Sequence, residues 1–392
     1  LPTHDNPKSR MQRIIDSIRI GEVENERGII RLDVDKLDED SIDVKLGRIT
    51  VGTPIVKEAN GATHELTPME ARLRDLTYSA PIFLEVTIIE NGIDREPEKV
   101  KIGDLPIMIK SKRCNLHREM MSQDRNLTDD QYYKKLQEMG EDPLDPGGYF
   151  IINGTERSLI SLEDLSPNRV LVEWEEKYGT PMAVAKVFSQ REGFRALTSV
   201  ELKKDGILMV SVPAAPTQIP LVILMKALGM DADEDIAKAI VSDERMNNII
   251  YANLEEGAVT YAVNTIEDSL NYLEKKFATG QAKEFREKKV ESIIDKSLLP
   301  HLGDHRDQRI KKAIYLGRIA RSVLELKLGQ RDPDDKDHYA NKRISLAGDL
   351  MEDLFRVAFT SLMKDLKYQL ERTITRKRKL RVSSAIRPDV LS

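Results

Sequence analysis

The sequence is poor in cysteine, in aromatic residues and in long hydrophobic runs. A single cysteine, Cys114, excludes a disulfide framework or a cysteine-based zinc site within these 392 residues. The longest apolar runs, such as residues 219–225, are far too short to cross a bilayer, so we expect no membrane partner. Aromatic residues make up 5% of the chain and seldom alternate with basic ones, which argues against a base-stacking surface for single-stranded nucleic acid. Together these features predict an intracellular protein.

Neither sign of charge dominates the composition. The chain has 61 Lys and Arg residues against 66 Asp and Glu residues, and a formal net charge of −5 excludes a protein whose whole surface is basic. This balance is compatible with one basic face on an otherwise acidic body. The length of 392 residues predicts at least two compact bodies. Because the first residue is Leu1 and the last residues show no closing element, we expect a piece of a longer protein.

Hydrophobic periodicity predicts a fold that mixes hairpins and helices. Three dipeptides separate pairs of extended segments, and their residue types suit the positive φ angles of hairpin turns. These dipeptides are Asn91-Gly92, Asn153-Gly154 and Asp205-Gly206. After Pro220 the apolar spacing changes to three or four residues, which predicts helices over 266–277, over 310–324 and over a five-turn segment from Ala347. We therefore predict an α+β fold with a hairpin-rich first part, a helix-rich middle and a long final helix.

Several clusters of metal-binding residue types do not complete a site. The carboxylates that begin at Asp231 and at Asp332 alternate as in a calcium-binding EF-hand loop, but both segments lack its sixth-position glycine and twelfth-position glutamate. His301 and His305 lie four residues apart in a segment that its proline and glycine predict to be a loop. Cys114 has no catalytic partner nearby, and no dinucleotide-binding or phosphate-loop motif occurs. We expect no catalytic residue and no metal ligand in this chain.

Basic residues are concentrated near the carboxyl end. Seven of them lie between Glu371 and the end of the chain: Arg372, Arg376, Lys377, Arg378, Lys379, Arg381 and Arg387. Such a block can neutralise several nucleic-acid phosphates. It is equally typical of a solvated face or of a contact with an acidic partner subunit, and charge alone leaves both interpretations open.

Six motifs follow one another in an order known from one protein family. They are PMEARLRDLTYSAP at 68–81, IMIKSKRC at 107–114, DPGGYFIINGTER at 145–157, IPLVILMKALG at 219–229, LPHL at 299–302 and DKDHYANKRISLAG at 335–348. In these motifs the chain resembles the amino-terminal part of the second-largest subunit of multisubunit DNA-directed RNA polymerases of the archaeal and eukaryotic type. The matches extend over most of the chain.

The resemblance implies two domains, which in that family are called the protrusion and the lobe. Residues 1–167 would form the first part of the protrusion, residues 168–336 the lobe, and residues 337–392 the return to the protrusion, ending towards the fork. The resemblance also implies that the catalytic magnesium and the zinc of this nucleotidyltransferase lie elsewhere in the assembled enzyme. We expect no cofactor in this chain and no activity from it alone.

The resemblance further implies that Arg157 faces the nucleic acid in the polymerase cleft. Its alternative role is that of a hairpin residue in an ion pair with Glu156 or Glu163. Arg387 lies where the chain approaches the fork, near the RNA–DNA hybrid, although the match to the family is looser there.

Six further basic residues complete the candidate nucleic-acid-binding set. They are Lys342, Arg343, Arg376, Lys377, Arg378 and Lys379. For Lys342 and Arg343 the favoured interpretation is packing at the start of the final helix and an ion pair with the 332–337 loop.

The leading functional hypothesis is a noncatalytic part of an RNA polymerase that forms one wall of the DNA cleft. Expected partners are the DNA template and RNA–DNA hybrid, the largest subunit, the remainder of the second-largest subunit, and initiation and elongation factors. The compartment would be the cytoplasm in an archaeon and the nucleus in a eukaryote. The alternative is a scaffold that docks such factors with little nucleic-acid contact. A basic cleft face would favour the first hypothesis, and an exposed apolar patch the second.

Overall fold

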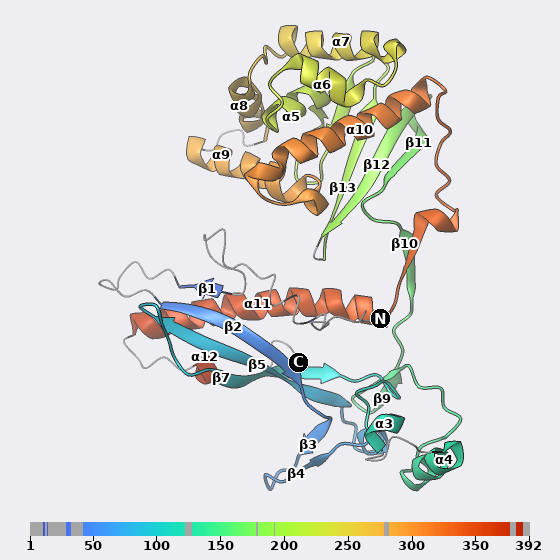
Figure 1. Cartoon of the computed structure of the whole chain (residues 1–392), viewed down its shortest axis with the longest axis vertical. Coiled ribbons are helices and arrows are strands. Elements are labelled where there is room, and N and C mark those ends of the chain that lie inside the picture. The colour runs from blue at the N-terminus through green and yellow to red at the C-terminus, as the bar shows by residue number, and fades with distance from the viewer. Residues whose placement is uncertain are drawn as a thin grey trace. The chain divides into compact units, whose positions relative to one another are not determined.

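Antiparallel sheets packed against helices make up both parts of the chain (Figure 1), which confirms the predicted α+β class. The computed structural model describes residues 11, 14, 29–32, 42–121, 128–177, 179–191, 193–277, 282–376 and 382–386. The contacts divide the chain into a first unit, residues 1–161 with 345–392, and a second unit, residues 162–344. The assignment of these units to a protrusion and a lobe stays a prediction.

The first unit is built on a five-stranded antiparallel sheet. Its strands run in the order β1 (Ile29–Arg31), β2 (Ile42–Val51), β5 (Ser79–Glu90) and β6 (Ile93–Asp94), and β7 (Glu98–Pro106) also pairs with β5. Along β5 the side chains from Ile82 to Ile88 are buried at every second position, as the two-residue period of a strand requires. One face of the sheet is therefore apolar and needs a covering element.

The long helix α11 (Ala347–Thr375) covers that apolar face. Its buried stripe consists of Phe355, Phe359, Leu362, Met363, Leu366, Leu370 and Ile374. These side chains share one core with residues of β1, β2, β5 and β7, and α11 runs beside the sheet in Figure 1. The short helix α12 (Val382–Ala385) adds Val382 and Ala385 to the same core. Segments from both ends of the chain thus build a single core.

A second core cluster of the first unit lies around Tyr78, Leu116, Leu136 and Ile151, which are fully buried. It gathers α2 (Pro68–Leu73), α4 (Asp129–Glu138) and the hairpin of β8 (Phe150–Ile152) and β9 (Thr155–Arg157). Threonines begin both helices: Thr67 Oγ1 accepts the Glu70 N–H, and Thr128 forms a capping box. The hairpin of β3 (Ile55–Lys57) and β4 (Thr63–Glu65) and the short helix α3 (Arg118–Met121) complete the unit.

The second unit contains a meander of five antiparallel strands. They are β11 (Val170–Lys177), β12 (Thr180–Arg191), β13 (Phe194–Leu202), β14 (Leu208–Ser211) and β15 (Ile219–Pro220), each paired with the next. Six helices follow: α5 (Leu221–Ala227), α6 (Asp233–Ile240), α7 (Glu244–Val259), α8 (Ile266–Phe277), α9 (Lys283–Ser292) and α10 (Arg309–Lys327). Strand and helix side chains share one core, in which α10 crosses the sheet (Figure 1).

Two short strands mark the ends of the second unit. β10 (Leu162–Leu165) pairs with β16 (Lys342–Ser345), and the Ser166 N–H donates to Asn341 O over 2.8 Å. The outgoing and returning chain segments therefore lie side by side.

Local predictions about turns and helices agree well with the structure. The Asn91-Gly92 and Asn153-Gly154 turns each join two strands with positive φ angles at both residues. At Asp205-Gly206 the hairpin forms, but only Gly206 has a positive φ, because five residues separate the paired Leu202 and Leu208. The helix over 266–277 has the predicted bounds.

Candidate nucleic-acid interface

Arg157 lies at the end of the β8–β9 hairpin. Phe150 pairs with Arg157 and Ile152 with Thr155, so the two turn residues are Asn153 and Gly154. Their φ angles of 49° and 73° belong to the tightest class of hairpin turn. The buried Phe150 anchors the first strand, whereas the whole second strand is exposed. The hairpin therefore presents Arg157 to solvent from a short, well-defined element.

The turn packs directly against the segment that follows α2. The Gly154 N–H donates to Leu76 O over 3.0 Å, and the Asn153 N–H donates to Thr77 Oγ1 over 3.1 Å. A Cβ atom on Gly154 would lie 2.6 Å from Asp75 Oδ1 and 2.8 Å from Asp75 Cα, so the close approach requires glycine. These contacts fix the orientation of the hairpin within the first unit.

Arg72 of α2 ties the exposed strand to two other segments. Its Nε donates to Glu156 Oε1 over 2.7 Å and its Nη1 to Glu141 Oε2 over 3.0 Å. Its Nη2 donates to the Tyr149 hydroxyl over 2.8 Å, which in turn donates to Asp145 Oδ2 over 2.5 Å. Glu141 is buried, with 6% of its surface exposed, so this guanidinium balances a carboxylate that water hardly reaches.

The protonation states of the network follow from the same contacts. Burial alone would raise the pKa of Asp145, but the hydrogen bonds from Tyr149 and the Gly147 N–H lower it overall. Burial, followed by the hydrogen bond to Asp145, raises the pKa of Tyr149. At neutral pH the network thus contains ionised Asp145 and a neutral tyrosine that links this carboxylate to Arg72.

The guanidinium of Arg157 forms no ion pair within the described part of the chain, and the side chain is exposed. Both carboxylates that the sequence offered as partners are engaged elsewhere, Glu156 by Arg72 and Glu163 by Lys342. Among the described residues Arg157 therefore has no carboxylate partner, and it lies next to Glu156, which Arg72 holds in place.

Lys342 and Arg343 lie on β16 and differ in their contacts. Lys342 Nζ pairs with Glu163 Oε1 over 2.6 Å, and this hydrogen bond raises the pKa of the lysine. From the 332–337 loop only Asp337 approaches it, at 4.0 Å. The expected structural ion pair therefore exists, but its main partner is on β10. Arg343 is exposed and donates to the carbonyls of Ala340 and Lys342.

The basic block near the carboxyl end is described only at its start. Arg376 is exposed and follows the last residue of α11. Lys377, Arg378, Lys379 and Arg387 lie outside the described residues.

Residues that resemble metal ligands have structural partners. Asp233 and Asp235 occupy the first turn of α6, where carboxylates favour the positive end of the helix dipole. Asp334 accepts the Val172 N–H and pairs with Arg331. His301 lies 2.7 Å from Ser189 Oγ, and burial lowers its pKa.

One cluster of possible ligands was not predicted. Glu58 and Glu70 lie beside His64, whose Nε2 is 3.0 Å from Glu70 Oε1. Arg74 Nη1 donates to Glu58 over 2.7 Å and to Glu70 over 2.6 Å. The guanidinium already supplies the positive charge between these carboxylates, so the arrangement is a surface ion-pair network.

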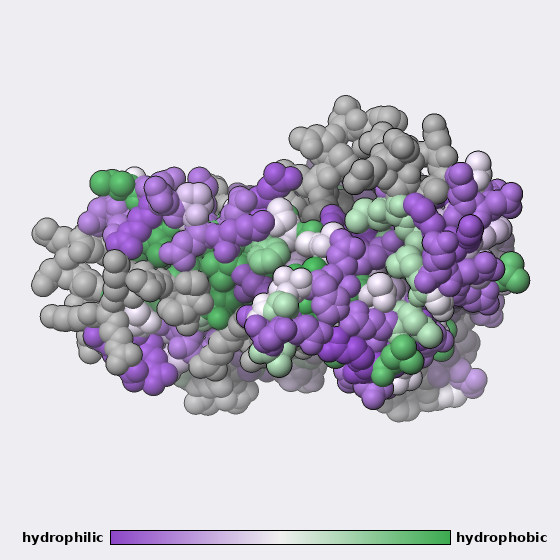
Figure 2. All heavy atoms as spheres, turned by 90° about the horizontal axis from the view of Figure 1, so that it is seen from below, coloured by the Kyte–Doolittle hydropathy of each residue, from purple (hydrophilic) through white to green (hydrophobic). Residues whose placement is uncertain are grey.

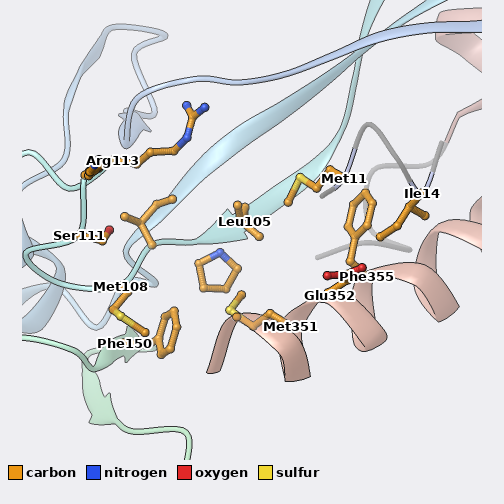
Figure 3. Close-up of a pocket in the computed structure, with 14 residues that line it drawn as sticks. Met11, Ile14, Leu105, Met108, Ser111, Arg113, Phe150, Met351, Glu352 and Phe355 are labelled. Carbon is orange, nitrogen blue, oxygen red and sulfur yellow. The ribbon is translucent and has the colours of Figure 1, made fainter. Parts of the chain in front are cut away.

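An apolar pocket of about 380 Å³ opens on the first unit, between the end of β7 and the first turns of α11. Met108, Phe150 and Met351 point toward one another in it, and Arg113 extends away from them (Figure 3). Lys112 and Arg113 are among the lining residues, but the Arg113 guanidinium donates to Val51 O, and the carboxylate of Glu352 pairs with Arg356. The lining suits an apolar side chain and lacks the carboxylate pair or nucleophile–base pair that catalysis would need.

The described surface is largely polar. On the face shown in Figure 2, hydrophilic side chains predominate and apolar ones form small separate patches. Among the described residues, every helix is too short or too polar to cross a membrane.

Comparisons with known proteins agree with the six sequence motifs. A family model described as RNA polymerase beta subunit matches residues 12–392. The chain is 48% identical to the DNA-directed RNA polymerase subunit Rpo2N of Methanocaldococcus jannaschii, over 99% of this chain and 74% of that protein. It is 45% identical to Rpo2N of Halobacterium salinarum, over 95% of this chain and 70% of that protein. It is also 44% identical to Rpo2 of Saccharolobus solfataricus, of which it spans only 32%. The chain therefore belongs to the RNA polymerase beta subunit family.

Proposed function

We propose that this chain forms one wall of the DNA cleft in a multisubunit DNA-directed RNA polymerase. In this proposal Arg157 contacts the nucleic-acid backbone, and Arg343, Arg376, Lys377, Arg378, Lys379 and Arg387 are further candidates for contact with nucleic acid. Lys342 is the weakest candidate of the set, because its charge is balanced by Glu163. The largest subunit, the rest of the second-largest subunit and transcription factors are the protein partners. The archaeal relatives favour a cytoplasmic enzyme.

The observation that carries this proposal is an exposed guanidinium on a fixed hairpin with no ion-pair partner among the described residues. Such an arginine binds a phosphate without first breaking an ion pair to any of them. Fixing the hairpin in advance also lowers the entropy that binding would otherwise cost. The neighbouring carboxylate, Glu156, would repel phosphate, but its ion pair with Arg72, which also pairs with Glu141, screens part of its charge.

Catalysis belongs to other parts of the assembly in this proposal. A two-metal mechanism needs carboxylates that hold two ions about 4 Å apart. In the described part of the chain, the carboxylates of Asp334, Glu58 and Glu70 are already in hydrogen bonds or ion pairs. The magnesium and zinc of the enzyme would accordingly be bound by residues outside this chain.

The test compares the half-lives of elongation complexes made with unchanged polymerase, with Arg157→Ala and with Arg157→Lys, over a range of salt concentrations. One lost arginine–phosphate contact should cost on the order of 1–3 kcal/mol. Because one phosphate contact is lost, the alanine variant should show a shallower salt dependence, with its largest deficit at low salt. Lysine should restore the salt dependence but only part of the half-life, since it keeps the charge and loses the planar fork.

The matched control is Arg48→Ala, which removes another exposed arginine of the first unit that forms no ion pair with a described residue. The half-life of its elongation complexes should depend on salt concentration as that of the unchanged enzyme does. If the Arg157 curves also superimpose on that of the control, Arg157 is a structural hairpin residue and the proposed contact does not exist.

The pocket favours a second candidate function, the docking of a protein partner. An apolar cavity of this size suits an apolar side chain of a partner. Met108→Arg would block the pocket, and it should weaken assembly or factor binding without changing the salt dependence of DNA binding. The opposite result, an altered salt dependence with normal assembly, would favour the cleft wall alone.

A further inference from the structure

One face of α11 is exposed along most of the helix, opposite the stripe that packs on the sheet. From Leu354 onward the exposed residues are spaced by three or four positions: Leu354, Val357, Ser361, Lys364, Tyr368, Arg372 and Thr375, with Arg376 after the helix. We call these residues the outer stripe. With a rise of 1.5 Å per residue it extends for ~33 Å. Spacing of this kind produces a straight seam on a helix surface.

The amino-terminal half of the outer stripe is apolar. Leu354 is 70% exposed and Val357 is 67% exposed, although both are large hydrophobic residues on neighbouring turns. The helix beneath them is rigidly anchored, since Phe355 and Phe359 are buried in the core with ring centroids 5.4 Å apart. A fixed pair of exposed apolar side chains is a surface that another protein can cover favourably.

The carboxyl-terminal half of the outer stripe is basic. Lys364, Arg372 and Arg376 are exposed, and none of them forms an ion pair with a described residue. Elsewhere on α11, Lys367 pairs with Glu371 and Arg356 with Glu352, Asp365 accepts from Gln369, and the exposed Asp353 lies just before the outer stripe. Between Leu354 and Arg376 no exposed residue of α11 is acidic.

Tyr368 lies between the basic residues and is 59% exposed. Tyrosine and arginine are the residue types that contribute most to protein interfaces. A surface with an apolar half and a basic half selects one orientation of its partner, because only one orientation matches both halves.

We propose that the outer stripe of α11 is the docking surface for an amphipathic α-helix of another polypeptide in the polymerase assembly. That helix places apolar side chains against Leu354 and Val357 and places Asp or Glu residues against Lys364 and Arg372. The straight, three-to-four spacing fits a second helix better than an irregular loop. The apolar half favours a protein over nucleic acid, which would leave Leu354 and Val357 uncovered. This surface goes beyond the Arg157 contact and rests only on the chain working inside a multisubunit enzyme.

The test places a photoreactive p-benzoylphenylalanine at position 368 of the fully reconstituted polymerase. The enzyme is irradiated alone, with its initiation factors on promoter DNA, and during elongation. We expect a crosslink to a polypeptide, and mass spectrometry should map it to a helical segment with apolar and acidic residues in separate halves. The control carries the same group at Tyr251 of α7, which is also 59% exposed but lies four residues before Glu255.

Charge reversal and charge restoration then test the recognition. A double change, Lys364→Glu with Arg372→Glu, should lower the crosslink yield at least five-fold while the helical circular dichroism stays unchanged. Replacing the matching acidic residues of the partner by lysine should restore the yield. Leu354→Asp alone, without the charge reversal, should also lower the crosslink yield.

Three outcomes would overturn the proposal: a crosslink to DNA or RNA alone, a yield that charge reversal does not change, or no polypeptide crosslink above the Tyr251 control at any stage. The half-lives of elongation complexes made with the Arg157 variants test the cleft proposal separately.

Discussion

At the residue scale, two arginines near the β8–β9 hairpin have different roles. Arg72 lies on α2, and Arg157 lies on β9. Arg72 is shielded by three partners from different segments, Glu141, Tyr149 and Glu156. Arg157, only one residue after Glu156, is left without a carboxylate among the described residues. The first arginine holds the hairpin, and the second is presented by it.

We expect Arg72→Ala to destabilise the first unit by about 2–4 kcal/mol. The change leaves the buried Glu141 carboxylate without its counter-charge, and breaking such a pair is costly. Arg72→Lys should recover less than half of this, because a single ammonium cannot reach three acceptors in the geometry of the guanidinium. Urea unfolding followed by circular dichroism measures both variants.

The control for this comparison is again Arg48→Ala, which should change the free energy of unfolding by no more than about 0.5 kcal/mol. A loss of that small size for Arg72→Ala would mean that the network contributes little to the stability of the first unit.

At the element scale, α10 stabilises an unusual helix end in the second unit. The chain after α9 forms a π-helical turn, Ile293–Ser297. Lys312 of α10 is fully buried, and its Nζ donates to Ile294 O over 3.0 Å and to Asp295 O over 2.6 Å. Arg309, one turn earlier, forms two hydrogen bonds with the Asp295 carboxylate. Lys312 thereby donates to two carbonyls of the π turn, and Arg309 binds the Asp295 carboxylate beside them.

This buried lysine predicts a pH dependence of stability. Burial lowers the pKa of Lys312 from 10.5 to about 8, even though Asp295 acts in the opposite direction. Between pH 8 and pH 10.5 the unfolded chain therefore holds a proton that the folded chain has lost, so the free energy of unfolding should rise with pH in that window. The gain should be on the order of 2–3 kcal/mol.

The measurement is the difference in unfolding free energy between the unchanged protein and Lys312→Met at pH 7.5, 8.5 and 9.5. Taking the difference removes the titration of the other lysines and tyrosines. We expect the unfolding free energy of the unchanged protein to increase relative to that of Lys312→Met as pH rises. Parallel curves would show that Lys312 titrates as an ordinary lysine and that water reaches its ammonium group.

At the scale of the whole molecule, the two units have separate hydrophobic cores. Phe359 lies in the core that α11 shares with the first sheet, and Leu316 lies in the core that α10 shares with the second. Both side chains are fully buried. The first core joins both ends of the chain, whereas the second is built from one continuous segment.

Separate cores predict two thermal transitions. Phe359→Ala should lower the midpoint temperature of one transition, because it reduces the free energy of unfolding of the first unit by about 3–5 kcal/mol. Leu316→Ala should do the same for the other transition, with a reduction of about 2–5 kcal/mol for the second unit. The measurement is differential scanning calorimetry. We expect two peaks, and each substitution should move only one of them. A single peak that both substitutions move equally would mean that the units unfold as one cooperative body.

The sequence by itself determined the features that depend on neighbours along the chain. The positive φ angles at Asn153-Gly154 follow from the residue types, and the helix over 266–277 follows from apolar spacing. The ordered motifs likewise identified the family, which the comparisons confirm. A single sequence is enough to predict such features because each depends on residues that are close together along the chain.

Only the tertiary structure decided which of several plausible partners each side chain has. Leu354 belongs to the apolar pattern of the last helix but is largely exposed, because the first sheet covers only one side of α11. Arg72 and Glu156 lie 84 residues apart, and Lys342 and Glu163 lie 179 apart. Pairs at such separations depend on how the cores pack, and local sequence offers several carboxylates that would serve equally well. That no described carboxylate pairs with Arg157 is therefore a product of the fold.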